Sequence, residues 1–278
     1  MRVIGVAITG AVIAAIGALS IAGPARAPTT HFVPATTTTI PSEVDPFTTT
    51  ALASYLKSRV NLVTAAVYDV TSAKTYVYNP GVHEVTASMV KIDILAALLY
   101  QVQGEHRSLT KRENTLATKM VVDSNNPAAT RLWNEVGQLP AMTAFHQMVG
   151  YRQTIMSWAW GEIETTPIDE LALLKAIALP NAILTDSSRA YEQSLMQSTD
   201  LSARFGLGDG PPPGATVGLK DGYFPEPKTG WQINSAGYVH LGKRFYLAAI
   251  MTSHNPNEAY GINTVNGVAK MIWESLRP

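Results

Sequence analysis

The hydrophobic pattern divides the 278-residue chain into three parts. An almost unbroken apolar stretch runs from Val3 to Gly23. Residues 28–44 are mostly Thr, Pro and Ala, and this composition is typical of a flexible linker because it offers few large side chains to bury. Residues 45–278 carry strand-like and helix-like patterns and are numerous enough for one large domain or two closely joined lobes.

The first part of this patterned region predicts a helix, a hairpin and then mainly helices. Residues rich in β-branched and aromatic side chains at 63–70 and 74–80 flank a turn at 71–73, which predicts two antiparallel strands. The predicted helices lie at 48–60, at the strongly apolar stretch 86–100, and over most of 110–198. The order therefore places a mostly helical segment after the first hairpin.

The last part returns to strands and closes on a helix. Strand patterns occur at 215–220, 231–241 and 244–251, and Gly242-Lys243 supplies the turn between the last two. A helix at 257–276 is expected to pack on the sheet beside the helix at 48–60. The pattern as a whole predicts an α/β sandwich with a helical lobe and a groove between the two.

The N-terminus indicates export. Arg2 precedes the apolar stretch, and Ala25-Arg26-Ala27 after it offers a small-x-small cleavage site, so residues 1–27 are predicted to be a signal peptide. The apolar stretch 3–23 is long for a signal, and an uncleaved membrane anchor is the alternative. Either alternative predicts an extracellular or cell-envelope location.

Composition narrows the possible chemistry. The sequence contains no cysteine, which excludes disulfides, thiolate metal ligands and a lipidated cysteine behind the apolar stretch. The 21 basic and 21 acidic residues balance, so nothing in the charge points to nucleic acid or to a strongly acidic substrate.

Candidate chemistry begins at Ser88 and Lys91, at the head of the apolar helix. Residues three apart on a helix lie about 5–6 Å apart at Cβ, so the Lys91 amine can reach the Ser88 hydroxyl. Leu95, Leu98 and Leu99 continue the apolar stripe and indicate that this helix is buried. Burial favours the neutral amine, which makes Lys91 a plausible base. Alone, this Ser-x-x-Lys spacing is also that of an N-cap serine followed by a solvated lysine.

Two further segments favour a catalytic role for Ser88 and Lys91. Ser124-Asn125-Asn126 lies in the predicted helical segment, and Lys220-Asp221-Gly222 ends a predicted strand. With Ser88-x-x-Lys91, their order and spacing resemble the three boxes of the penicillin-recognising serine hydrolases, specifically class A β-lactamases, over roughly residues 45–275. The resemblance implies a five-stranded antiparallel sheet with flanking helices plus a mostly helical lobe, in a β-lactamase/transpeptidase-like domain at 45–278.

The resemblance also implies roles for individual residues. Ser88 would be the nucleophile and Lys91 its base, while Ser124 and Lys220 would return a proton to the leaving group. Asn126 would bind a substrate amide, and the backbone amides of Ser88 and Tyr223 would hold the oxyanion. Asp221, Gly222 and Tyr223 would line the substrate site. This mechanism needs no metal and no organic cofactor.

The third box has a competitor in Lys228-Thr229-Gly230, a literal match to the family pattern. Pro225 and Pro227 precede it, and proline removes a ladder donor from a central strand. We therefore assign the third box to Lys220. Its neighbour Asp221 departs from the family's hydroxyl residue and would repel an anionic substrate. Either the substrate binds without its carboxylate at this position, or Asp221 points away.

A second departure concerns deacylation. In class A β-lactamases a glutamate upstream of a segment similar to Thr165-Thr166-Pro167 activates water, yet no Asp or Glu occurs between Glu135 and Glu162. Glu162 and Glu164 lie close to that segment. Their simpler interpretation is as acidic residues near a helix N-terminus, where the helix dipole favours negative charge. His146 is the remaining candidate, although a lone histidine is more often structural.

Two hypotheses of different class follow. The first is an exported serine hydrolase that forms an acyl-enzyme with a small-molecule β-lactam or a peptidoglycan-derived amide or ester and deacylates slowly. The second is a non-catalytic cell-envelope protein that keeps the fold and only binds. The joint presence of the proton-transfer residues favours the first, because a binding protein has little need of them.

Overall fold

The computed structural model describes residues 44–200, 204–227 and 230–276. These belong to one compact unit that spans Pro41–Pro278. The signal or anchor predicted at 1–27, and the linker predicted at 28–44 apart from Val44, lie outside the described residues. In the described part of the chain, no helix combines the length and apolar content that a membrane crossing requires.

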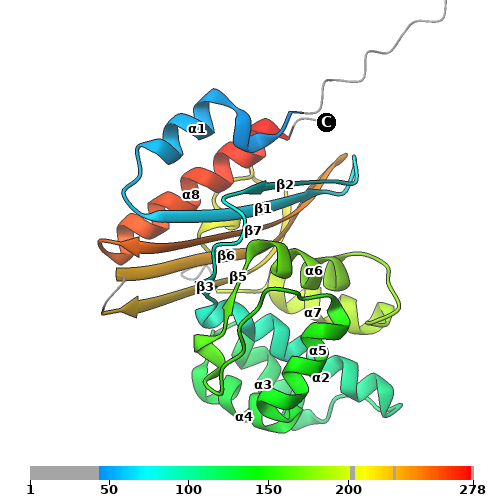
Figure 1. Ribbon diagram of the computed structural model, residues 1–278. Helices are drawn as coiled ribbons and strands as arrows, with labels where there is room; N and C mark the ends of the chain where they lie inside the picture. The colour runs from blue at the N-terminus through cyan, green and yellow to red at the C-terminus, as the bar shows by residue number, and fades with distance from the viewer. Residues whose placement is uncertain (1–43, 201–203, 228–229, 277–278) are drawn as a thin grey trace, which may run out of the picture. The chain divides into compact units, whose positions relative to one another are not determined.

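Five antiparallel strands form the central sheet, in the order β2-β1-β7-β6-β5 (Figure 1). The strands are β1 (Leu62–Asp69), β2 (Lys74–Tyr78), β5 (Thr216–Glu226), β6 (Gly230–Leu241) and β7 (Arg244–Asn255). A separate pair of two-residue strands, β3 (Glu84–Val85) and β4 (Glu164–Thr165), ties the two lobes of this unit together. The five-stranded antiparallel sheet predicted through the family resemblance is confirmed.

One strand is longer than the sequence predicts. β5 does not end at Lys220 but continues to Glu226, with Pro225 paired opposite Trp231. The physical reason is its position at the edge of the sheet, where a strand needs ladder donors on one side only and tolerates proline. Lys220 therefore lies in the middle of a strand rather than at its end.

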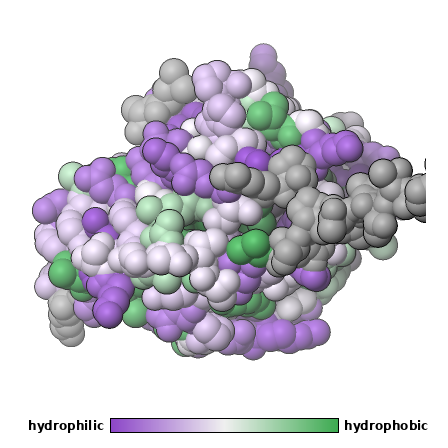
Figure 2. Space-filling model, turned by 90° about the horizontal axis from the view of Figure 1, so that it is seen from above, coloured by the Kyte–Doolittle hydropathy of each residue, from purple (hydrophilic) through white to green (hydrophobic). Residues whose placement is uncertain are grey.

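Two helices cover one face of the sheet. They are α1 (Thr50–Lys57) and α8 (Glu258–Ser275), which run side by side as predicted (Figure 1). Their apolar stripes pack on Val67, Ile250 and Ile233, and this packing forms one hydrophobic core. Figure 2 views the molecule from this side, where apolar residues are scattered among hydrophilic ones.

The other face of the sheet carries the helical lobe. Its helices are α2 (Lys91–Gly104), α3 (Lys111–Val121), α4 (Asn126–Val136), α5 (Gln138–Val149), α6 (Pro167–Ala178) and α7 (Asp186–Gln197). Every residue of α2 from Lys91 to Leu99 is buried, so this helix is the centre of the lobe (Figure 1). A second core surrounds it, and the candidate nucleophile lies where α2 begins, facing the sheet.

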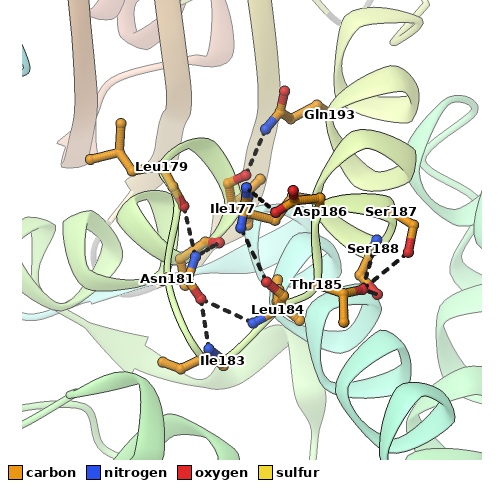
Figure 3. Close-up of polar contacts among 12 residues, drawn as sticks. Ile177, Leu179, Asn181, Ile183, Leu184, Thr185, Asp186, Ser187, Ser188 and Gln193 are labelled. Carbon is orange, nitrogen blue, oxygen red and sulfur yellow. Dashed lines mark hydrogen bonds and ion pairs between the residues drawn. The ribbon is translucent and has the colours of Figure 1, made fainter. Parts of the chain in front are cut away.

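Asn181 makes several of the bonds that hold the connection between α6 and α7 (Figure 3). Asn181 donates to the carbonyls of Ala176 and Leu179 at 2.7 Å each, and its Oδ1 accepts from the amides of Ile183 and Leu184. Thr185 then caps α7 by accepting from the Ser188 amide. These bonds satisfy backbone groups that the helix ends leave free.

Buried acids lie behind α2. Asp93, two residues beyond Lys91, has its Oδ1 2.9 Å from His146 Nε2 and accepts from the Tyr151 hydroxyl at 2.9 Å. Glu170 on α6 and Glu192 on α7 are fully buried beside this group. Burial, reinforced by the nearby Asp93 charge, raises the pKa of Glu170 and Glu192 well above the ordinary value.

This pKa shift makes the stability pH-dependent. Above the ordinary pKa the unfolded chain has released a proton that folded Glu170 still holds, so each pH unit destabilises the fold by about 1.4 kcal/mol per group, until the raised pKa is reached. Glu170→Gln removes this loss. We expect the melting temperature of the variant to exceed that of the wild type by more at pH 8 than at pH 5.

Thermal unfolding followed by circular dichroism at the two pH values measures the difference. The control is Glu162→Gln, the same substitution at an exposed position, where burial gives no reason for a pH-dependent difference. The titratable groups around Glu170 that could offset the effect are Asp93, Asp169, His146 and Glu192. A pH-independent difference in Glu170→Gln would mean that the carboxylate is ionised in the folded protein.

Candidate active site

Ser88 lies in a short 3-10 turn, η2 (Ala87–Val90), which leads directly into α2. The turn is anchored by the Thr86 amide, which donates to the Ile163 carbonyl at 2.8 Å. Ala87 has a φ of 50°, a left-handed conformation that is uncommon for a residue with a Cβ. This conformation turns the backbone directly before the half-buried Ser88.

Lys91 joins the first two boxes. Its Nζ lies 2.8 Å from Ser88 Oγ, 2.6 Å from the Ser124 carbonyl, 3.0 Å from Ser124 Oγ and 2.8 Å from Asn126 Oδ1. The structure therefore brings together Ser88, Lys91, Ser124 and Asn126, four of the predicted site residues.

The protonation of Lys91 follows from its surroundings. The residue is fully buried, and this desolvation, with the nearby Lys220 charge second, lowers the pKa of Lys91 to about 7. A neutral amine has two N–H groups, which the Ser124 carbonyl and Asn126 Oδ1 can accept. Its lone pair then remains for the Ser88 hydroxyl proton, and this is the arrangement that a general base requires.

The second box is held by a strained turn and a helix cap. Ser124 has a φ of 52°, so its carbonyl and its hydroxyl both reach Lys91. Asn125 accepts from the Ala128 amide at 2.8 Å and caps α4. The amide at position 125 thus supplies a structural anchor in place of the family's aspartate.

The third box lies on β5, beside η2. A Cβ on Gly222 would lie 2.6 Å from the Thr86 carbonyl oxygen and 3.1 Å from the Ser88 amide nitrogen, so only glycine lets this edge strand approach the nucleophile turn. Lys220 is fully buried two residues earlier, on the same face of the strand. Its Nζ donates to the Asp221 carbonyl at 2.9 Å, and burial lowers the pKa of Lys220 to about 8.

Asp221 is separated from the other site residues. Adjacent residues of a strand point to opposite faces, and the Asp221 carboxylate accepts from the Phe205 amide at 2.8 Å on the α8 side of the sheet. Burial raises the pKa of Asp221 to about 7. Its predicted place in the substrate site is thus not supported by the geometry, and the alternative in which Asp221 points away is the one the fold adopts.

The other residues predicted for the third box are Tyr223 and the competing Lys228 and Thr229. Tyr223 directly follows Gly222 on β5, beside η2, and is 53% exposed. The role of its backbone amide as an oxyanion donor stays a prediction. The competing Lys228 and Thr229 lie outside the described residues.

No candidate acid for deacylation contacts the nucleophile in the described part of the chain. Glu162 is exposed in η3 (Trp160–Glu162), and Glu164 is paired opposite Val85 in the small sheet. His146 is held against Asp93, which lies roughly 200° around α2 from Lys91, so the histidine belongs to the core of the helical lobe.

The residue that covers Lys91 instead is Trp160, which sequence reasoning missed. Its ring lies 5.3 Å from Lys91 Nζ, and its Nε1 donates to Thr130 Oγ1 at 3.1 Å. No local pattern marks this tryptophan, because the path of the loop that carries it depends on tertiary packing. Among the described residues, no group of His, Asp and Glu has the arrangement of a metal site.

Ser88, the buried amine of Lys91 and Ser124 lie in contact where the helical lobe meets β5, an arrangement that fits a serine hydrolase. A sequence profile of the beta-lactamase enzyme family matches residues 113–276, more than half of the chain. The chain therefore belongs to the beta-lactamase enzyme family and is a serine hydrolase by class.

Solved structures with the same fold include β-lactamases and PBP-A. The TLA-1 extended-spectrum β-lactamase matches with a TM-score of 0.73 at 20% identity, covering 81% of this chain and 96% of that one. A class A β-lactamase from Bacteroides cellulosilyticus matches at 0.71 and 18%, covering 80% and 94%. The structure of PBP-A matches at 0.71 and 19%, covering 80% and 92%. No curated protein matches the chain.

Proposed function

We propose that this protein is acylated at Ser88 by a β-lactam or by a cell-wall peptide amide or ester, and that it releases the acyl group slowly. The observation that carries the proposal is the contact of buried Lys91 with both Ser88 Oγ and Ser124 Oγ. A lysine whose pKa is about 7 can remove the serine proton without a metal or a histidine.

The chemistry proceeds by acyl transfer. Ser88 Oγ forms a bond to the substrate carbonyl carbon while neutral Lys91 takes the hydroxyl proton. When the carbon–nitrogen or carbon–oxygen bond breaks, Ser124, positioned beside Lys91, returns a proton to the leaving group, with Lys220 favouring its transfer electrostatically. The acyl group remains on Ser88 as an ester until water attacks it.

One structural neighbour supports the substrate class. A point mutant of PBP-A, solved as an acyl-enzyme complex with penicillin G, matches this chain with a TM-score of 0.71 at 19% identity. A β-lactam is therefore the first ligand to try. The apolar stretch 3–23 supports export, with either a cleaved signal or a retained anchor that would keep the domain at the cell envelope.

Mass spectrometry of the intact protein after incubation with a fluorescent penicillin tests the proposal. We expect one covalent adduct on the wild type and none on Ser88→Ala. The control is Ser157→Ala, which changes a serine that bonds only the Ala159 amide in the described residues and should leave labelling intact. An unlabelled wild type would favour the binding-protein alternative, and a labelled Ser88→Ala would place the nucleophile elsewhere.

A further inference from the structure

A groove of about 700 Å³ is lined by residues of α3 and α4. These two helices lie in the helical lobe, away from the central sheet (Figure 1). Its walls include Lys111, Thr115 and Lys119 from α3, Asn125 at the N-cap of α4, and Ala128 and Arg131 from α4 itself. None of these side chains takes part in the acyl transfer described above.

The groove is positively charged. Lys111, Lys119 and Arg131 are all exposed, and none of them forms an ion pair within the described ranges. A fourth cation, Arg112, is neutralised by Glu135 at 2.5 Å. The groove therefore carries about three uncompensated positive charges, although the chain as a whole has a formal net charge of zero.

The charges have a regular spacing. Lys111, Thr115 and Lys119 are four residues apart on one face of α3, so the two lysines stand about 12 Å from each other along the helix. Between the cations the floor is apolar, formed by the buried side chains of Leu116 and Ala128. Lysine and arginine stems can lie along such a floor while their charged ends reach a ligand.

The groove also begins beside the catalytic turn. Asn125 uses Oδ1 to cap α4, which leaves the Nδ2 donor of the same amide available to a ligand. Its neighbours Ser124 and Asn126 both contact Lys91. A carboxylate at position 125 would have placed a negative charge at the groove, and the asparagine avoids it.

We propose that this groove binds an extended acidic peptide segment. An extended chain advances about 3.3 Å per residue, so acidic residues four apart match the distance between Lys111 and Lys119. The apolar floor favours a peptide over a purely anionic polymer, because a peptide offers apolar side chains between its carboxylates. This site lies beyond the proposed acylation and does not depend on it.

Fluorescence anisotropy with the full chain tests the site. The probe is a labelled ten-residue peptide with glutamate at every second position and alanine or valine between. The double variant Lys119→Glu/Arg131→Glu should bind at least ten-fold more weakly than the wild type. The matched control Lys57→Glu/Lys270→Glu, which makes the same charge change at exposed positions on α1 and α8, should stay within two-fold.

Three results would overturn the proposal: equal loss in both double variants, equally tight binding of a peptide with glutamine for glutamate, or tighter binding of inorganic polyphosphate of equal charge. If the charge-reversed variant does not fold by circular dichroism, Lys119→Gln/Arg131→Gln replaces it. Penicillin labelling of Ser88 should be unchanged in these variants. The labelling measurement therefore tests the proposed acylation independently of peptide binding in the groove.

Discussion

Replacing Lys91 by alanine should slow acylation of Ser88 by roughly 10²–10⁴, the range that a positioned general base contributes. The amine contacts Ser88 Oγ at 2.8 Å, and among the described residues no other base contacts that hydroxyl. The wild-type rate should also rise with pH through about 7 and level off above, because burial lowers the pKa of Lys91 to about 7 and only the neutral amine accepts a proton. Lys91→Ala should lose this inflection.

Stopped-flow acylation with a fluorescent penicillin between pH 5 and 9 measures both effects. The matched control is Lys175→Ala, since Lys175 is another lysine whose pKa burial lowers, but its amine lies over the Tyr68 ring away from the nucleophile. An unchanged rate in Lys91→Ala would remove the lysine from the mechanism. A slower rate that keeps the inflection near pH 7 would assign the proton acceptor to another group.

The elements that the sequence predicts best are those with local signals. The hairpin of β1 and β2 and the hairpin of β6 and β7 follow from alternation and from turn residues, and their register agrees with that pattern. The end of β5 cannot be predicted from local signals, because Pro225 breaks a central strand but not an edge strand. The position of a strand within the sheet is a tertiary property that alternation does not contain.

The contacts within the candidate site also differ in how well local sequence signals predict them. Ser88 and Lys91 are three residues apart, so helical geometry alone predicts their contact. Ser124 lies 33 residues from Lys91 in sequence, and only the resemblance of the three boxes indicates that their atoms meet. Asp221 follows Lys220 in a strand, and alternation alone should have placed its carboxylate on the opposite face.

His146 shows what local patterns cannot predict. Its neighbour Asp93 is 53 residues away in sequence, on a different helix, and their 2.9 Å contact is buried. Neither residue carries a signal that distinguishes a buried pair from a residue facing the groove. Local patterns also cannot predict the course of the loop containing Trp160, because that course depends on the packing of η3 against η2.

The acyl-enzyme should be long-lived. The loop that follows α5 offers no carboxylate to Lys91, and the space beside the amine holds the Trp160 ring at 5.3 Å. Loss of one general base corresponds to roughly 10²–10⁴ in rate, which is about 3–5 kcal/mol of barrier. With a chromogenic cephalosporin we therefore expect a stoichiometric burst followed by slow turnover, seen by stopped flow and by mass spectrometry of the accumulated adduct.

Introducing a carboxylate by substitution provides a second test of slow deacylation. Trp160→Glu would place a carboxylate beside Lys91, where it can activate a water for attack on the Ser88 ester. Trp160→Gln is the matched control, because it loses the same ring and the same bond to Thr130 but cannot accept a proton. Deacylation should be at least about ten-fold faster in the glutamate variant than in the glutamine variant. This is less than the roughly 10²–10⁴ of a well-positioned general base, because the geometry of the new carboxylate is not optimised. Rapid multiple turnover by the wild type, with no accumulated adduct, would instead show that a group such as Glu162 or Glu164 already activates the water.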